Sequence, residues 1–177
     1  MNLKAQILDA NAISRTIKRI SHEILEKNDS LENVCLVGIK TRGVPFARRI
    51  SDFIKSIEGI ELPTGVLDIT FYRDDLSHTA DFPQLNSDEI DFDTTGKNII
   101  LVDDVIYTGR TVRAALDAII THGRPSKIQL AVMCDRGHRE LPIRPDYVGK
   151  NVPTAKSEII RVNFAETDGT DSLELYE

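Results

Sequence analysis

Residues 99–102, Ile-Ile-Leu-Val, lead directly into two adjacent acids, Asp103 and Asp104. The length and the β-branching of this run are typical of a strand that is buried on both faces of a parallel sheet. A short polar turn over residues 107–111 follows, and residues 112–120 carry apolar side chains at helical spacing. A strand, a turn and a helix in this order indicate an α/β fold, in which ligands bind beyond the carboxyl ends of the strands.

The turn and the acids have the chemistry of a sugar-phosphate site. The start of the helix offers unpaired backbone N–H groups and the positive end of a dipole to a phosphate. Thr108 and Thr111 add hydroxyl donors, and Gly109 permits close backbone approach or a positive φ. Because Asp103 and Asp104 can accept hydrogen bonds from vicinal ribose hydroxyls, the pattern favours a ribose 5-phosphate over a phosphate alone.

Simpler interpretations of this segment are weaker. The acids can cap a helix and Gly109 can merely make a turn, but adjacent acids at the end of a buried strand are costly without a partner. No Gly-x-x-x-x-Gly-Lys sequence precedes the threonine, which excludes a Walker A loop, and the Gly-x-Gly-x-x-Gly dinucleotide turn is also absent.

The composition predicts an ordinary cytoplasmic protein. A length of 177 residues predicts one domain over residues 1–177, and 41% apolar with 28% charged residues are usual for a soluble globular chain. No apolar stretch approaches the ~18 residues of a membrane span, so no membrane partner is expected. The N-terminus lacks the apolar core of a secretory signal, and Cys35 and Cys134 lie in predicted buried strands, as core thiols of a reducing compartment do.

Strands and helices alternate along the chain. Asp9 can cap a helix that runs to about Asn28, and Pro45 fits the start of a second helix. Strands are predicted at 34–39, 64–72, 98–103, 127–134 and 158–164, with a helix at 110–122. This alternation predicts a doubly wound, mostly parallel sheet with right-handed crossovers. The polar segment 73–96 is too long for a simple connection and is predicted to be an inserted lid.

A second loop with phosphate chemistry follows the strand at 34–39. It reads Gly38-Ile39-Lys40-Thr41-Arg42-Gly43. Consecutive backbone N–H groups in a tight turn form an anion-binding nest. Lys40 and Arg42 add full charges, and a guanidinium binds phosphate oxygens in bidentate fashion. An ordinary connecting loop with solvated bases is the alternative.

The basic residues are clustered rather than spread over the chain. The net charge of −6 by itself argues against a general nucleic-acid binder. Arg15, Lys18, Arg19 and His22 nevertheless share one face of the first helix, and further bases gather between residues 136 and 156. The two groups are predicted to form one basic surface, although a solvated helix face is the usual interpretation of the first group alone.

The apolar strand, the acid pair and the Thr-Gly-x-Thr loop together resemble the 5-phosphoribosyl-1-diphosphate (PRPP) motif of type I phosphoribosyltransferases. Segments 38–43, 68–75, 135–144 and 148–154 narrow the resemblance to bacterial regulators of pyrimidine operons that are also uracil phosphoribosyltransferases. This similarity runs essentially from one end of the chain to the other.

The resemblance implies conversion of uracil and PRPP to UMP and diphosphate, with Mg²⁺ bound together with PRPP and no metal assigned to protein ligands. Mg²⁺ and residues 40–42 would carry the leaving diphosphate, and the acids would hold the ribose hydroxyls. Arg42, Asp103 and Asp104 are therefore the predicted catalytic residues. The predicted PRPP-binding residues are Lys40, Thr41, Arg42, Gly43, Ile99, Ile100, Leu101, Val102, Asp103, Asp104, Val105, Ile106, Tyr107, Thr108, Gly109, Arg110 and Thr111.

The same resemblance implies binding to a hairpin of the pyr mRNA leader, promoted by UMP or UTP, and assembly into a homodimer or a higher homo-oligomer. Few bases are needed if the RNA loop is recognised by hydrogen bonding rather than by bulk charge. The predicted RNA-binding residues are Lys18, Arg19, His22, His138, Arg139, Arg144 and Lys150.

Three alternative functions use the same motif. A salvage enzyme for uracil or a purine base keeps the PRPP site without binding RNA. A regulator that binds UMP without useful turnover keeps both surfaces and lacks catalysis. A ribose-phosphate pyrophosphokinase shares the PRPP loop, but it needs a longer, duplicated chain than 177 residues.

Overall fold

The computed structural model describes residues 1–69 and 88–177. Residues 73–87 of the predicted lid and residues 70–72 of the predicted strand lie outside the described residues. The elements in chain order are β1 (Leu3–Leu8), α1 (Ala10–Lys27), β2 (Val34–Ile39), α2 (Gly43–Glu58), β3 (Thr64–Leu67), β4 (Asn98–Ile106), α3 (Arg110–Thr121), β5 (Lys127–Asp135), β6 (Tyr147–Asn151), β7 (Ile159–Asn163), α4 (Ala165–Asp168) and β8 (Ser172–Tyr176).

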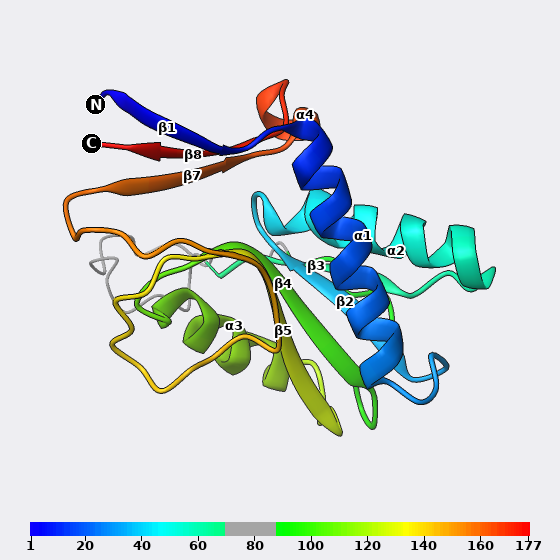
Figure 1. Ribbon diagram of the computed structural model, residues 1–177. Coiled ribbons are helices and arrows are strands. Elements are labelled where there is room, and N and C mark those ends of the chain that lie inside the picture. Colours follow the sequence, from blue (N-terminus) through cyan, green and yellow to red (C-terminus); the bar gives the residue numbers. More distant parts are fainter. Residues whose placement is uncertain (70–87) are drawn as a thin grey trace.

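The centre of the molecule is a five-stranded parallel sheet in the order β3-β2-β4-β5-β6. Helices α1 and α2 lie on one face of this sheet and α3 lies on the other (Figure 1). The side chains of β4 alternate accordingly, because Ile100 and Val102 join the core under α1 and α2 while Ile99 and Leu101 join the core under α3. The predicted α/β fold with a doubly wound, mostly parallel sheet is confirmed.

The predicted first helix is also confirmed. Asp9 is its N-cap, and the carboxylate accepts a hydrogen bond from the backbone N–H of Ala12 at 2.7 Å. The apolar stripe that faces the sheet is fully or almost fully buried. It consists of Ile13, Ile17, Ile20 and Ile24.

A second sheet stands beside the first. It is antiparallel, with the order β1-β8-β7, and it brings the two termini side by side at the upper left of Figure 1. The last predicted strand, at 158–164, belongs here and not to the parallel sheet. Parallel pairing needs a crossover connection, usually a helix, and residues 152–158 between β6 and β7 contain none. Strands β1, β6 and β8 were not predicted from the sequence.

The two sheets share one hydrophobic core. Ile160, Val162, Phe164 and Leu173 of the antiparallel part belong to the same cluster as the buried faces of α1 and α2. A shared core is the defining feature of a domain. We therefore propose that residues 1–177 form a single domain.

Three carboxylates of segment 164–171 anchor it to α2 through two arginines. Arg49 of α2 pairs with Glu166 at 2.6 Å and with Asp171 at 2.8 Å. Hydrogen bonds from Arg49 lower the pKa of both carboxyl groups below their ordinary values. Asp168 pairs with Arg42, one residue before α2. The tail thus carries acids that are engaged in specific pairs.

These pairs predict how the stability of the fold depends on pH. A carboxyl group whose pKa is lower in the folded state stabilises it above the ordinary pKa of about 4, and this contribution is lost as the pH falls through the folded value. We expect Asp171→Asn to lower the free energy of unfolding at pH 7 by about 1–2 kcal/mol, because a charge-assisted hydrogen-bond pair is lost. Its stability should then fall less steeply than that of the wild type between about pH 5 and pH 2.

Urea unfolding followed by circular dichroism at several pH values measures this difference. Asp52→Asn is the matched control, since Asp52 is an exposed carboxylate on the same helix as Arg49. Equal pH slopes for the wild type and for Asp171→Asn would contradict the prediction.

Candidate active site

The acid pair lies inside β4 and not after its end. Parallel pairing with β5 continues past the acids to Ile106 opposite Asp135, so the predicted end of the strand at residue 103 was too early. Asp103 is only 6% exposed, and its carboxylate accepts a hydrogen bond from the backbone N–H of Asp104 at 2.9 Å. The carboxylate of Asp104 accepts the N–H of Val105 at 2.9 Å. Each acid is therefore held by the backbone of the residue that follows it.

Burial governs the electrostatics of Asp104. It raises the pKa of Asp104 above the ordinary value, and hydrogen bonds to Asp103 and to the N–H of Val105, together with the charge of Arg42, oppose this shift. Buried carboxylates are stable only when donors surround them. The pair is thus suited to a ligand that brings hydroxyl donors.

The loop after β4 forms a small cavity at the N-terminus of α3. Gly109 is the N-cap of this helix and has the left-handed backbone conformation, with φ at 94°, that glycine readily adopts. The cavity has a volume of about 440 Å³ and is lined by residues 105–112 and Glu140. Thr108 Oγ1 lies 3.4 Å from the N–H of Arg110. Backbone N–H groups at a helix start and threonine hydroxyls are the predicted phosphate-binding groups, and the structure brings them together.

The glycine-flanked loop after β2 lies directly against β4. A Cβ atom added to Gly43 would lie 2.2 Å from the carbonyl oxygen of Val102, and one added to Gly38 would lie 2.7 Å from that of Gly43. Only glycine permits this approach of backbone to backbone. The loop therefore sits one residue away from the acid pair, as expected for loops at the carboxyl ends of neighbouring parallel strands.

The charged groups of this loop have acidic neighbours. Lys40 Nζ lies 3.8 Å from a carboxylate oxygen of Asp68. The guanidinium of Arg42 donates to Asp168 through Nε at 3.0 Å and through Nη2 at 2.7 Å. Asp168 was missed as a functional candidate because the sequence presents it only as one acid of an acid-rich tail, and no local pattern connects residues this far apart.

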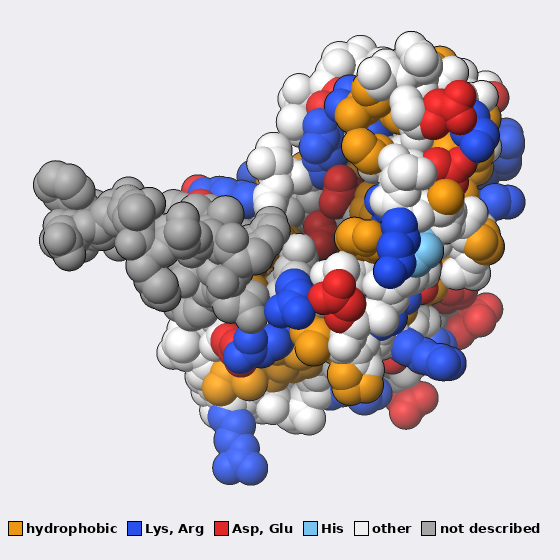
Figure 2. Space-filling view, turned by 90° about the vertical axis from the view of Figure 1, so that its left-hand side faces the viewer, with side chains coloured by type: hydrophobic (Ala, Val, Ile, Leu, Met, Phe, Trp, Pro, Cys, Tyr) orange, Lys and Arg blue, Asp and Glu red, His pale blue; other side chains and the backbone are white. Residues whose placement is uncertain are grey.

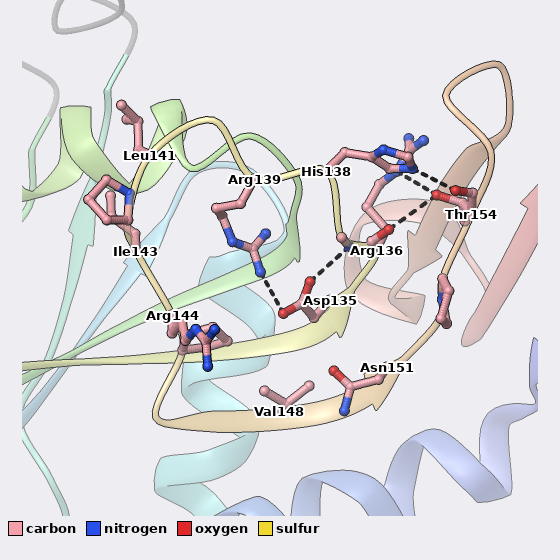
Figure 3. Close-up of a pocket in the computed structure, with 14 residues that line it drawn as sticks. Asp135, Arg136, His138, Arg139, Leu141, Ile143, Arg144, Val148, Asn151 and Thr154 are labelled. Atoms are coloured by element: carbon pink, nitrogen blue, oxygen red, sulfur yellow. Dashed lines mark hydrogen bonds and ion pairs between the residues drawn. The ribbon is translucent and has the colours of Figure 1, made fainter.

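A larger cavity of about 1000 Å³ lies next to the carboxyl ends of β5 and β6 (Figure 3). Arg139 crosses its floor and donates to Asp135 at 2.6 Å and to the carbonyl oxygen of Tyr107 at 2.6 Å. His138 contacts the carbonyl oxygen of Thr154 at 2.5 Å. Arg139 therefore links this cavity to the loop after β4 at Tyr107.

The lining of this cavity contains residues that the sequence did not single out. They combine apolar side chains with one amide and so resemble a small-molecule pocket more than a solvated loop. The signal that could have pointed to them was the family resemblance of segments 135–144 and 148–154, which contain all of them. They include Leu141, Ile143, Val148 and Asn151.

Two of the predicted RNA-binding residues, Lys18 and His22, pack against α2. The ring of Phe53 lies 5.9 Å from Lys18 Nζ and 5.4 Å from the His22 ring, measured to ring centroids. Both residues are exposed on the surface of α1. They face the second helix rather than the cavity.

The other predicted RNA-binding residues lie near β6. Arg19 donates to the carbonyl oxygens of residues 148 and 149 at 3.0 and 2.7 Å, and Lys150 follows on the same strand. Arg144 precedes the strand and is exposed, whereas His138 and Arg139 are partly buried in the cavity wall. The structure therefore brings His138, Arg139 and Arg144 to one cavity and Arg19 to the strand that borders it.

The face with the loops is hollowed between its basic groups. Figure 2 shows acidic side chains recessed in the centre of this view, with lysine and arginine side chains around them. In residues 1–69 and 88–177, no group of three or more His, Cys, Asp or Glu side chains could hold a metal ion. Over the same residues, none of the helices is both long and apolar enough to cross a membrane.

The sequence matches the family described as phosphoribosyl transferase domain over residues 4–167. It is 60% identical over 177 residues to the Bifunctional protein PyrR of Clostridium perfringens strain 13, covering 100% of this chain and 99% of the relative. The chain belongs to the PyrR family of phosphoribosyltransferases. Another relative, the Bifunctional protein PyrR of Deinococcus deserti, is 58% identical over 174 residues, with 98% of this chain and 95% of the relative covered. The predicted resemblance is thus confirmed.

Solved structures agree on the fold of this PyrR-family chain. A hypoxanthine-guanine phosphoribosyltransferase from Bacillus anthracis superposes with a TM-score of 0.71 at 19% identity, covering 100% of both chains. A hypoxanthine phosphoribosyltransferase from Trypanosoma cruzi gives a TM-score of 0.77 at 16% identity, with 99% of this chain and 96% of that chain covered. At such low identity the likeness concerns the fold, and the base specificity has to come from this chain's own pocket.

Proposed function

We propose that this chain has two functions, as a uracil phosphoribosyltransferase and as a uridine-nucleotide-dependent regulator that binds the pyr mRNA leader. The observation that carries the proposal is the identity of 60% to a bifunctional PyrR protein along the whole chain. The enzymatic function has independent support in the acid pair of β4, the cavity at the start of α3 and the loop at Gly43, which adjoin one another.

In this proposal each of the two loops binds a different end of PRPP. The 5-phosphate occupies the cavity at the start of α3, where Thr108, Gly109 and Thr111 surround it. The diphosphate lies against residues 40–43, and the ribose hydroxyls donate to the buried acid pair. The negative charge of Asp104 then stabilises the positive charge that develops on the ribosyl carbon as diphosphate leaves.

Uracil occupies the large cavity beyond β5 and β6. This cavity adjoins the phosphate loop at Tyr107, so a base bound there lies beside the ribose. Ile143 and Val148 offer apolar contact to the ring, and Asn151 offers hydrogen bonds to its edge. Catalysis then consists chiefly of holding the two reactants in line, because the bond between C1 and diphosphate is already labile.

Mg²⁺ is proposed to arrive with PRPP. It prefers oxygen ligands and keeps several waters, so substrate phosphates with one or two carboxylates suffice. The carboxylates of Asp103 and Asp104, one residue beyond the contact of Gly43 with Val102, are oxygen ligands of the kind that the ion would need, although no metal is assigned to protein ligands. When bound, the ion neutralises charge on the leaving diphosphate, while Lys40, Thr41 and Arg42 orient that group.

The regulatory function needs a second surface. We place it on the exposed bases Lys18, Arg19, His22, Arg144 and Lys150, with His138 and Arg139 at the cavity wall. Because the last two also line the proposed uracil pocket, a bound uridine nucleotide can alter the RNA-binding side of the same loop. A protein that acts on a nascent leader works where transcription takes place, which in bacteria is the cytoplasm. Assembly into a homodimer or a higher homo-oligomer stays a prediction.

One preparation tests both functions. Filter binding of a pyr leader hairpin is measured with and without UMP, and UMP formation from uracil and PRPP is measured beside it. UMP should tighten hairpin binding, and the hairpin should tighten UMP binding by the same factor. Turnover without any UMP-dependent hairpin binding would leave a salvage enzyme, and hairpin binding without turnover would leave a regulator only.

Single substitutions separate the two surfaces. We expect Lys150→Ala to weaken hairpin binding while uracil turnover stays close to that of the wild type, because Lys150 does not line the cavity proposed for uracil. Each lost phosphate contact should reduce the slope of log affinity against log salt by about one unit at most. Lys127→Ala removes the same charge at the start of β5, at the opposite end of the sheet, and serves as the control. A loss of turnover that parallels the loss of hairpin binding would contradict separate surfaces.

A further inference from the structure

The pairing of Arg42 with Asp168 joins the proposed diphosphate loop to the C-terminal part of the chain. Arg42 precedes α2, and Asp168 is the last residue of α4. The carboxylate accepts from Nε and from Nη2 of the guanidinium, so the contact runs along one side of the arginine. The side chains are 33% and 16% exposed, which means that water can screen the pair only in part.

Asp168 is itself held in place. The carboxylate oxygen that faces Nε also accepts the backbone N–H of Phe164 at 3.0 Å. The Phe164 ring stacks on Phe46 of α2 at 5.7 Å between centroids, and Arg49 binds the same segment through Glu166 and Asp171. The carboxylate is therefore fixed to α2 by contacts that do not involve Arg42.

The geometry of the pair determines which donors of the guanidinium remain for a ligand. Arginine presents its donors as a rigid planar fork. With Nε and one N–H of Nη2 directed at Asp168, the Nη1 group and the second N–H of Nη2 point away from the carboxylate. These are the donors that the contact with Asp168 leaves for a diphosphate in the proposed function. The negative charge of Asp104 also acts on Arg42, and together with the hydrogen bonds to Asp168 it raises the pKa of the guanidinium.

We propose that Asp168 is a positioning residue, which holds the guanidinium of Arg42 in the orientation that receives the diphosphate of PRPP. The proposal rests on the function proposed above for residues 40–43. A long arginine side chain loses rotamer freedom when it binds a ligand, and a partner that fixes it in advance removes that cost. Asp168 thus acts through Arg42 and does not itself touch the substrate.

The opposite role, in which Asp168 competes with diphosphate for Arg42, makes a contrary prediction. A competitor has to be displaced before the ligand binds, so its removal tightens binding. A positioning residue leaves the outward donors in place, so its removal weakens binding. The affinity of diphosphate ligands for an Asp168 variant therefore decides between the two roles.

Isothermal titration calorimetry in the presence of Mg²⁺ tests the proposal with PRPP, inorganic diphosphate and UMP. We expect Asp168→Asn to weaken the affinity for PRPP and for diphosphate by about 3- to 10-fold, which corresponds to the cost of ordering one side chain on binding. The affinity for UMP should not change, because UMP carries no diphosphate. Asparagine keeps an oxygen acceptor for the N–H of Phe164. Thermal unfolding verifies the fold, and Asp168→Glu, which displaces the carboxylate, is the second variant with the same expected selectivity.

A double-mutant cycle shows whether Asp168 acts through Arg42. Arg42→Ala should weaken PRPP and diphosphate, and Asp168→Asn should then have no further effect in that background. Asp52→Asn removes an exposed carboxylate from α2 outside this segment and should leave all three affinities unchanged. Tighter diphosphate binding by Asp168→Asn, equal losses for UMP and PRPP, or additive losses in the cycle would overturn the proposal. If Arg42→Ala itself left diphosphate binding intact, the function proposed for the loop would be wrong instead.

Discussion

The double variant Asp103→Asn/Asp104→Asn is expected to fold and to lose uracil phosphoribosyl transfer by ~10²-fold or more in kcat/KM. Asparagine retains an oxygen that can accept the backbone N–H groups now bound by the two carboxylates. What it removes is negative charge beside the ribosyl carbon and the strong acceptors for the ribose hydroxyls. The double variant should therefore lose activity but keep its fold, because the fold depends on the backbone contacts rather than on the charges.

Steady-state kinetics with uracil and PRPP measure this loss, and circular dichroism verifies the fold. Asp117→Asn is the matched control, since it removes an exposed carboxylate from α3, where Asp117 pairs only with Arg113 among the ion pairs of the described residues. A folded double variant with wild-type turnover would remove the acid pair from the PRPP site.

A large loss of stability is expected for Gly43→Ala. Its added methyl would lie 2.2 Å from the carbonyl oxygen of Val102 and 3.3 Å from the Cα of Asp103, and both contacts are with backbone. Because backbone cannot rotate away as a side chain can, the loop has to move off β4. We expect a cost of about 3 kcal/mol or more in the free energy of unfolding, at the upper end of overpacking effects.

Urea unfolding of Gly43→Ala beside Gly59→Ala isolates the packing effect. Gly59 ends α2 with φ at 70° and has no atom within 4 Å of an added Cβ, so its substitution carries only the backbone cost of about 1 kcal/mol. Equal losses for the two variants would show that the loop does not need close contact with β4. The activity of any folded Gly43→Ala protein should also fall, since the diphosphate loop would be displaced from the acid pair.

Several features of the fold follow from local sequence because their signals repeat at short range. The four isoleucines of α1 recur at helical spacing, and Asp9 sits where a cap is needed, so the helix and its boundaries are encoded within one segment. The adjacency of the two loops predicted to bind phosphate also follows from sequence. Each loop ends a buried strand, and the carboxyl ends of neighbouring parallel strands meet at one edge of the sheet.

Strand ends and short exposed strands were predicted less well. The acid pair marked a chemical boundary at residue 103, but hydrogen bonding to β5 continues to Ile106 because backbone pairing does not depend on side-chain polarity. Strands β1 and β8 pair across the whole length of the chain, and half of the side chains of β1 are exposed. A half-exposed strand of this kind carries a weak alternation signal.

By itself, the sequence determined the parallel α/β fold, the acid pair and the two loops predicted to bind phosphate, because the signal for each lies within a short segment of consecutive residues. Only the tertiary structure decided that the tail acid Asp168 pairs with Arg42, that Arg19 bonds to β6 and that Arg139, which lines the larger cavity, bonds to Tyr107. The physical reason is that these contacts join residues far apart in the chain. The packing of strands and helices determines which of these residues meet, and no short-range pattern of charge or hydrophobicity predicts that packing.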